Sequence, residues 1–164
     1  MSKAHEGRLR LDGEAKRKRY GRITAQLEER FRDTGDATAR MATAVALLHH
    51  KVPGFFWTGF YLLRDGGLTV GPYQGPLACL VLAPHTGICW AGIDRGETVV
   101  VADVHAFPGH IACDARSASE IVVPLNDTAG RIIGVLDVDS TRHANFDDVD
   151  AECLERIAAM IYGR

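Results

Sequence analysis

The sequence lacks any long apolar run. No segment approaches the roughly 20 consecutive apolar residues that a membrane-spanning helix needs, and the N-terminal stretch MSKAHEGRLRLDGEAKRKRY contains no apolar segment like that of a secretory signal. We therefore expect a cytoplasmic protein that does not bind membranes. In that reducing compartment the four cysteines stay reduced, so their positions are better interpreted for catalysis or metal binding than for a structural disulfide framework.

An excess of charge of one sign is also lacking. The chain has 19 Lys and Arg residues against 21 Asp and Glu residues, and its formal net charge is -2. This balance predicts no obligate polyanion partner, and the basic cluster Lys16–Arg19 has no interleaved aromatic residues on which bases could stack. We interpret the cluster as the solvated end of a helix and expect no nucleic-acid partner.

The length of 164 residues fits a single domain without internal repeats. We expect a flexible tail over residues 1–12 and one domain over residues 13–164. Within this domain, residues 13–51 form the N-terminal helices and residues 56–164 form the core. The helical pattern breaks at Gly35, which predicts one helix over residues 13–34 and a second over 36–51.

Short runs of β-branched and aromatic residues replace the helical pattern from Phe56 onward, and turn residues separate them. The runs expected as strands are WTGFYLL, LTVGPY, ACLVLA, VVVADV, EIVVPL and RIIGVLDVDS. A short helix is expected over residues 86–94 and a closing helix over 147–162. The stripe expected to face the core from the closing helix is Val149, Cys153, Ile157 and Met160. The predicted fold class is α+β, with helices from both ends of the chain packed on one face of an antiparallel sheet of five or six strands.

Three acidic residues are predicted to gather on one face of this sheet. Alternate residues of a strand share a face, so Asp137 and Asp139 point to the same side, and hairpin pairing brings Glu120 near Asp139. Crowded carboxylates cannot all ionise easily, so one of them would keep its proton at neutral pH and serve as a general acid. The alternative interpretation is that the strand leaves the core here and its acids face water.

Aromatic residues form a second pattern, because Trp57, Gly59 and Tyr61 share one face of their strand. Two aromatics separated by glycine would form a slot in which a small group approaches the backbone, and aromatic walls suit a ligand that carries sulfur. The alternative is an aromatic pair packed in the core, with the glycine relieving crowding.

Cys113 lies in the polar, turn-rich segment HAFPGHIACDARSASE rather than in an apolar run, and a loop of this length within a compact domain is usually functional or disordered. His110 and Arg116 flank it and would favour its thiolate, whereas nearby acids would oppose it. His105 and His110 with Cys113 also suggest a zinc-stabilised interaction protein. No cysteine pair has the close spacing of common structural zinc sites, however, and we expect no metal and no other cofactor.

The run from Trp57 to Asp150 resembles the free methionine-(R)-sulfoxide reductases, single-domain enzymes with the GAF fold. Four blocks carry the resemblance: WTGFYLL, VGPYQGPLAC, VVVADVHAFPGHIACDARSASEIVVPL, and GVLDVDS followed by FDDVD. The third block is highly specific for this family among GAF domains. The chain departs from the family after Cys89, where Trp90 stands in place of a small residue.

The resemblance implies a role for each matching residue. Cys113 would be the catalytic cysteine, Cys89 the resolving cysteine, and Cys79 a third cysteine that serves as an alternative disulfide partner. The implied substrate-binding residues are Trp57, Tyr61, Glu120, Asp137 and Asp139. The implied reaction reduces free methionine-(R)-sulfoxide, leaves Cys113 as a sulfenic acid, resolves it as a disulfide and relies on thioredoxin as reductant.

Proteins of this family typically form homodimers. The N-terminal helices of this chain match the family only loosely, so the resemblance implies the homodimer less strongly than it implies the site. The main rival function is a non-catalytic GAF module that senses a small ligand. Such sensors are usually joined to output domains, and we expect none in this chain.

Overall fold

The computed structural model describes residues 11–110 and 113–163. The helices are α1 (Gly13–Arg30), α2 (Ala37–Lys51), α3 (Gly87–Arg95) and α4 (Asp148–Tyr162), with a short 3-10 helix at Val104–Ala106. The strands are β1 (Trp57–Arg64), β2 (Gly67–Gln74), β3 (Val81–Leu82), β4 (Val99–Val101), β5 (Ser119–Asn126) and β6 (Ile132–Ser140). Within the described residues no helix is both long and apolar enough to cross a membrane.

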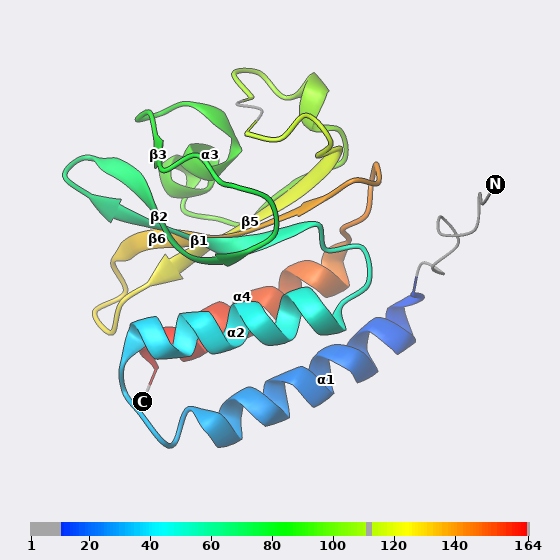
Figure 1. Ribbon diagram of the computed structural model, residues 1–164, viewed down its shortest axis with the longest axis vertical. Coiled ribbons are helices and arrows are strands. Elements are labelled where there is room, and N and C mark those ends of the chain that lie inside the picture. The colour runs from blue at the N-terminus through cyan, green and yellow to red at the C-terminus, as the bar shows by residue number, and fades with distance from the viewer. Residues whose placement is uncertain (1–10, 111–112, 164) are drawn as a thin grey trace.

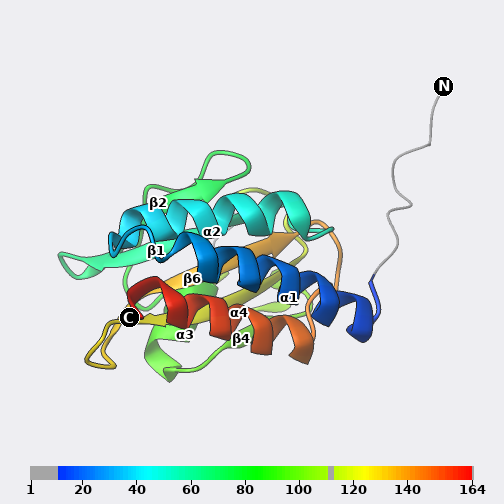
Figure 2. The same cartoon turned by 90° about the horizontal axis from the view of Figure 1, so that it is seen from below.

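The six strands form one antiparallel sheet in the order β3-β2-β1-β6-β5-β4. Helices α2 and α4 pack against one face of the sheet, α1 packs on the outer side of α2 and α4, and α3 lies against the opposite face (Figure 1). Figure 2 views the molecule from the helix side, with α1, α2 and α4 in front of the sheet. The predicted α+β class, with helices from both ends of the chain on one face, is confirmed.

Strand alternation divides the core into two apolar layers. The strand residues that face α1, α2 and α4 are Phe60, Leu62, Ile121, Val123, Leu125, Leu136 and Val138. The strand residues that face α3 include Trp57, Tyr61, Val122 and Val135. Neighbouring residues of one strand point to opposite faces of the sheet. Each strand can therefore bury one set of side chains against the helices and present the other set to a site on the α3 side.

The N-cap of α2 confirms its expected start, since the Asp36 side chain accepts a hydrogen bond from the Ala39 N–H at 2.8 Å. Helix α1 ends at Arg30, before the predicted Thr34, because the N–H groups of Arg32 and Asp33 bond to carbonyls three residues back, as in a turn, instead of four residues back. Met41, Ala44, Val45 and Leu48 form the buried apolar stripe of α2.

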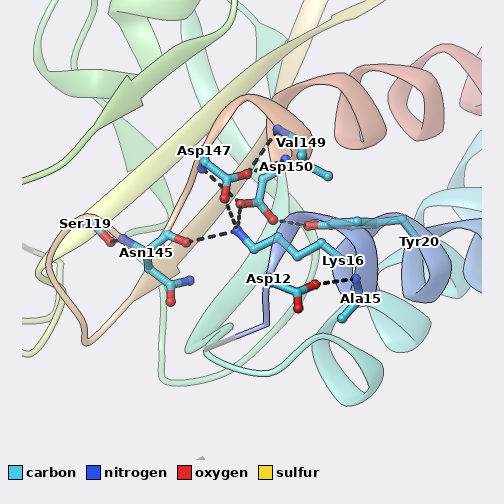
Figure 3. A network of polar contacts seen from close by, with 9 residues as sticks. All are labelled: Asp12, Ala15, Lys16, Tyr20, Ser119, Asn145, Asp147, Val149 and Asp150. Carbon is cyan, nitrogen blue, oxygen red and sulfur yellow. Dashed lines mark hydrogen bonds and ion pairs between the residues drawn. The ribbon is translucent and has the colours of Figure 1, made fainter. Parts of the chain in front are cut away.

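Lys16 is buried, so the interpretation of its cluster as wholly solvated is wrong at this position. Its ammonium donates to Asp147 Oδ2 at 2.8 Å and to Asp150, while the Tyr20 hydroxyl donates to Asp150 Oδ1 at 2.8 Å (Figure 3). The side chains of Lys16 and Asp150 are only 7% and 2% exposed. This network joins α1 to α4, and burial raises the pKa of Asp150 even though Lys16 and Tyr20 oppose the shift.

The same network explains a second difference on α4. The residues that it buries are Asp150, Leu154, Ile157, Ala158 and Ile161. Of the predicted stripe only Ile157 is buried, whereas Val149, Cys153 and Met160 are half-buried at its edge. The helix is rotated relative to the prediction because a paired acid occupies an inward position that sequence patterning assigns to apolar residues.

Replacing Lys16 by methionine is expected to lower the free energy of unfolding by about 3 kcal/mol, because Asp150 would lose its buried counter-charge. Urea denaturation followed by circular dichroism measures the change. The control Lys18→Met removes an equal charge from an exposed position of the same helix and should change stability little. Equal stability of the two variants would contradict a stabilising role for the network.

Candidate active site

The three predicted acids meet on the α3 side of the sheet, where β1, β6 and β5 lie next to one another. Asp139 is opposite Trp57 on one side and Glu120 on the other, while Asp137 is opposite Gly59. Glu120 and Asp137 are only 6% and 5% exposed. The acids therefore do not form the wet end of a strand, and the prediction that they share one pocket is supported.

Burial controls the ionisation of these acids. It raises the pKa of Glu120 well above its usual range, and the nearby charges of Asp137 and Asp139 raise it further. Burial raises the pKa of Asp137 to about 7 and that of Asp139 well above its usual range, although a hydrogen bond from Ser117 partly opposes the shift of Asp139. At neutral pH this cluster retains protons, so it contains a carboxylic acid that can donate one.

Cys89 lies at the start of α3, buried against the same acids. Its thiol donates a hydrogen bond to Glu120 Oε1, with Sγ and Oε1 4.0 Å apart. Burial raises the pKa of the Cys89 thiol well above normal, and the Asp137 and Glu120 charges add to the effect. Cys89 consequently remains a protonated thiol. Cys89, Glu120 and Asp137 also present donor atoms within 4.8 Å of one another, the geometry of a cluster that could hold a metal ion.

Three aromatic rings form a stack beside the acids. The Trp57 indole packs against Tyr61 and Tyr73, with ring centroids 5.7 and 5.4 Å apart. A Cβ at Gly59 would lie 2.5 Å from the Trp57 ring and 2.4 Å from Tyr73 Cβ. The space over Gly59 is therefore filled by tryptophan rather than open to a ligand. The alternative interpretation of this glycine holds, while Trp57 and Tyr61 still line the pocket.

Cys113 and Cys79 form a disulfide, with their Cα atoms 5.7 Å apart. The predicted strand ACLVLA shortens to Val81–Leu82, so Cys79 lies in the loop before β3 rather than on a strand. The Tyr61 hydroxyl donates to the Cys79 carbonyl at 3.0 Å. A pocket aromatic thus fixes the loop that supplies the partner of Cys113.

Arg116 and His110 contribute less to Cys113 than their spacing suggests. Arg116 pairs with Asp114, with its Nη2 2.8 Å from Asp114 Oδ2, and packs over the Phe56 ring. Hydrogen bonds from Arg116 hold the pKa of Asp114 at about 2. His110 lines the pocket, and burial together with His105 lowers its pKa, which favours a neutral imidazole near pH 7.

The acids, aromatics and cysteines surround one pocket with about 600 Å³ of empty space, its open mouth included, which is a size suited to a small ligand. The predicted site residues that line it are Trp57, Tyr61, Cys89, Cys113, Glu120, Asp137 and Asp139. Sequence reasoning missed Phe56, Leu77 and Ser117, which also line it. The only sequence signal for them was their proximity to predicted site elements: Phe56 precedes β1, Leu77 lies near Cys79, and Ser117 precedes β5.

Among residues 11–110 and 113–163, three polar atoms of the pocket lining are buried without a hydrogen-bond partner: Trp57 Nε1, His110 Nε2 and Asp137 Oδ1. Buried polar groups in folded proteins are nearly always paired, so such atoms point to a polar ligand. Trp90 is buried against His85, with ring centroids 4.9 Å apart, and is not among the lining residues. The Trp90 side chain, where the chain departs from the family, is therefore not part of the pocket wall.

Comparisons with known proteins identify the family to which the chain belongs. Residues 36–161 match the GAF domain model. The chain is 44% identical over 123 residues to the free methionine-R-sulfoxide reductase of Escherichia coli (strain K12), which covers 75% of this chain and 74% of that protein.

Two solved structures are similar over most of the chain. Free methionine-R-sulfoxide reductase from Neisseria meningitidis, solved in complex with its substrate, has a TM-score of 0.82 at 40% identity and covers 93% of this chain and 89% of its own. The reduced form of fRMsr of Staphylococcus aureus has a TM-score of 0.83 at 42% identity, with coverages of 87% and 92%. The chain therefore belongs to the GAF domain family and, within it, to the group of the free methionine-R-sulfoxide reductases.

Proposed function

We propose that this protein reduces free methionine-(R)-sulfoxide to methionine, using Cys113 as the nucleophile. The observation that carries the proposal is the Cys79–Cys113 disulfide beside a pocket whose wall is aromatic and whose acids retain protons. A sensing module needs a pocket, but it needs neither a cysteine pair within bonding distance nor a buried carboxylic acid. The named reductases among its relatives support the same conclusion.

The pocket offers a complementary group for each part of the substrate. The S-methyl group would pack against Trp57 and Tyr61, since sulfur and its substituents contact aromatic rings favourably. A carboxylate of the acid cluster would bind the ammonium group, with the unpaired Asp137 Oδ1 as the available acceptor. A residue within a polypeptide has no free ammonium, which explains a preference for the free amino acid.

The reaction begins with the reduced form of Cys113. Its thiolate attacks the sulfoxide sulfur, and a protonated carboxyl of the cluster delivers a proton to the oxygen as the sulfur–oxygen bond weakens. The bond between the two sulfurs then breaks as the protonated oxygen is transferred to Cys113, so methionine leaves as the reduced product and Cys113 becomes a sulfenic acid. The thiol of a second cysteine then displaces this hydroxyl as water and forms a disulfide.

Cys79 is our choice for that second cysteine, although the family resemblance named Cys89 first. The Cys79 sulfur already lies within bonding distance of Cys113, with Cα atoms 5.7 Å apart. The Cys89 thiol is held protonated among carboxylates, which makes it a poor nucleophile. Thioredoxin would then reduce the disulfide. The proposed location of the protein is the cytoplasm, and its proposed assembly is a homodimer.

Cys79→Ser is expected to release one methionine per chain and then stall with thioredoxin, because the sulfenic acid on Cys113 would have no partner. A small thiol should restore turnover by reducing the sulfenic acid directly. Cys89→Ser, the matched control, should keep turnover with thioredoxin. Rapid-quench quantification of methionine separates the two, and stalling of Cys89→Ser alone would return the resolving role to Cys89.

The substrate assignment is tested by supplying four sulfoxides separately: the R and S epimers of the free amino acid and of an N-acetylated methionine amide. We expect methionine only from the free R epimer, with thioredoxin, thioredoxin reductase and NADPH as the electron source. Release from the blocked compounds would contradict the role given to the ammonium group. No release from any of them by folded protein with free thiols would favour the ligand-sensing module.

A further inference from the structure

Large apolar side chains are exposed around Cys79. Leu77, Leu80 and Val81 are 87%, 72% and 63% exposed, and the remaining large exposed apolar residue of the described chain is Val100, at 43%. The run GPLACLVLAP, residues 75–84, contains no charged residue. Single exposed apolar residues are ordinary, but three within five positions place an unusual amount of exposed apolar surface beside Cys79. We name Leu77, Leu80 and Val81 the apolar rim.

The backbone holds this rim in place. The Tyr61 hydroxyl bonds to the Cys79 carbonyl at 3.0 Å, and the Val70 N–H donates to the Leu80 carbonyl at 2.9 Å. Val81 belongs to β3, which pairs with β2 at the edge of the sheet away from β4. Figure 1 shows β3 on the side of the sheet opposite α1, α2 and α4. The apolar side chains are thus displayed from an anchored segment.

The half-buried Cys79 lies between Leu77 and Leu80, and its sulfur is bonded to Cys113. Any macromolecule that reduces this disulfide has to bring a thiol to it and therefore has to cover its surroundings. Around Cys79 those surroundings are apolar and uncharged. A partner that fits them carries its attacking thiol on an apolar surface, and the position of the disulfide selects this partner over a second copy of the chain.

We propose that the apolar rim is the docking surface for a protein dithiol reductant, an inference that rests on the proposed redox cycle. The reductant thiolate attacks Cys79 Sγ, the bond to Cys113 Sγ breaks, and Cys113 leaves as a thiolate. The second thiol of the reductant then attacks the mixed disulfide, releases reduced Cys79 and leaves the reductant oxidised to its own disulfide. Cys113 is thereby returned directly as the nucleophile for the next cycle.

Kinetics with two electron donors test the rim. Leu80→Ser combined with Val81→Thr removes exposed apolar groups but leaves Leu77, which also lines the pocket, untouched. We expect kcat/KM for thioredoxin to fall about tenfold, a change typical of losing a few interface side chains, while turnover with dithiothreitol stays unchanged. The control Val100→Thr lies at the opposite edge of the sheet and should change neither value. An unchanged kcat/KM for thioredoxin would overturn the proposal.

Trapping on the unmodified chain gives an independent test that needs no sulfoxide. The oxidised protein is mixed with thioredoxin whose second active-site cysteine is replaced by serine, so that the mixed disulfide accumulates. We expect peptide mapping to place the link on Cys79, and hydrogen exchange to slow at residues 77–81 relative to the uncomplexed oxidised protein. A link on Cys113, or unprotected amides at the rim, would refute the docking surface.

The docking surface and the proposed reductase function can fail independently, and the experiments distinguish the two failures. If the wild-type chain releases no methionine with dithiothreitol, the proposed reductase function fails whatever the trapping shows. If methionine is released with dithiothreitol but the rim variant keeps full thioredoxin kinetics, only the docking surface fails.

Discussion

Cys113→Ser is expected to reduce methionine release to the background of the reaction without enzyme, with either thioredoxin or dithiothreitol as donor. The serine hydroxyl remains protonated at neutral pH and cannot replace a thiolate as nucleophile toward the sulfoxide sulfur. Cys79 cannot substitute, because its part in the proposed cycle begins only after a sulfenic acid has formed. Loss should therefore appear in the first turnover as well as in the steady state.

The matched control is Cys153→Ser. Cys153 is a free, half-buried cysteine on α4, on the face of the sheet opposite the pocket. Its substitution removes a thiol of the same kind and should leave turnover near the wild-type value. Equal loss of activity in both variants, or full activity in Cys113→Ser, would contradict the assignment of the nucleophile.

Asp139→Asn is expected to lower kcat by about 100-fold or more, the usual contribution of a positioned proton donor. The amide keeps the shape of the side chain but cannot deliver a proton to the sulfoxide oxygen. Thermal stability should not fall, because a buried carboxyl whose pKa is raised must take up a proton when the chain folds at neutral pH, and asparagine, which is neutral in both states, removes that cost. Single-turnover methionine release and thermal unfolding together measure the two effects.

The control for this variant is Asp127→Asn, in the turn between β5 and β6. Asp127 pairs with Arg131 and lies outside the pocket lining, so activity should remain while the local ion pair is lost. The wild-type rate of the chemical step should also fall as pH rises through the raised pKa of Asp139, because the proton donor is then lost. A melting temperature that falls in parallel with the activity of Asp139→Asn would instead support a structural role.

The candidate site could be predicted from the sequence where it depends on strand alternation. Asp137 and Asp139 share a face because they are two residues apart, and Glu120 joins them because a short turn fixes the hairpin register. The same rule places Trp57 and Tyr61 on the pocket side. The helices on one face follow from amphipathic patterning at the two ends of the chain.

Other features depend on contacts between distant residues and could not be predicted. The position of Cys79 is fixed by the Tyr61 hydroxyl and by a disulfide that spans 34 residues. The inward orientation of Asp150 depends on Lys16, which is remote in sequence. Nor does the sequence reveal that the Trp57 ring occupies the space over Gly59, because this depends on the stack with Tyr73 from β2.

The most direct measurement of the central claim is a single turnover without any electron donor. Fully reduced protein is mixed with one equivalent of free methionine-(R)-sulfoxide, methionine is quantified, and the cysteine pairing is then mapped by mass spectrometry. The account predicts close to one methionine per chain together with a new Cys79–Cys113 disulfide and a free Cys89 thiol. Release of methionine with all thiols still free, or no release while the protein remains folded, would contradict it.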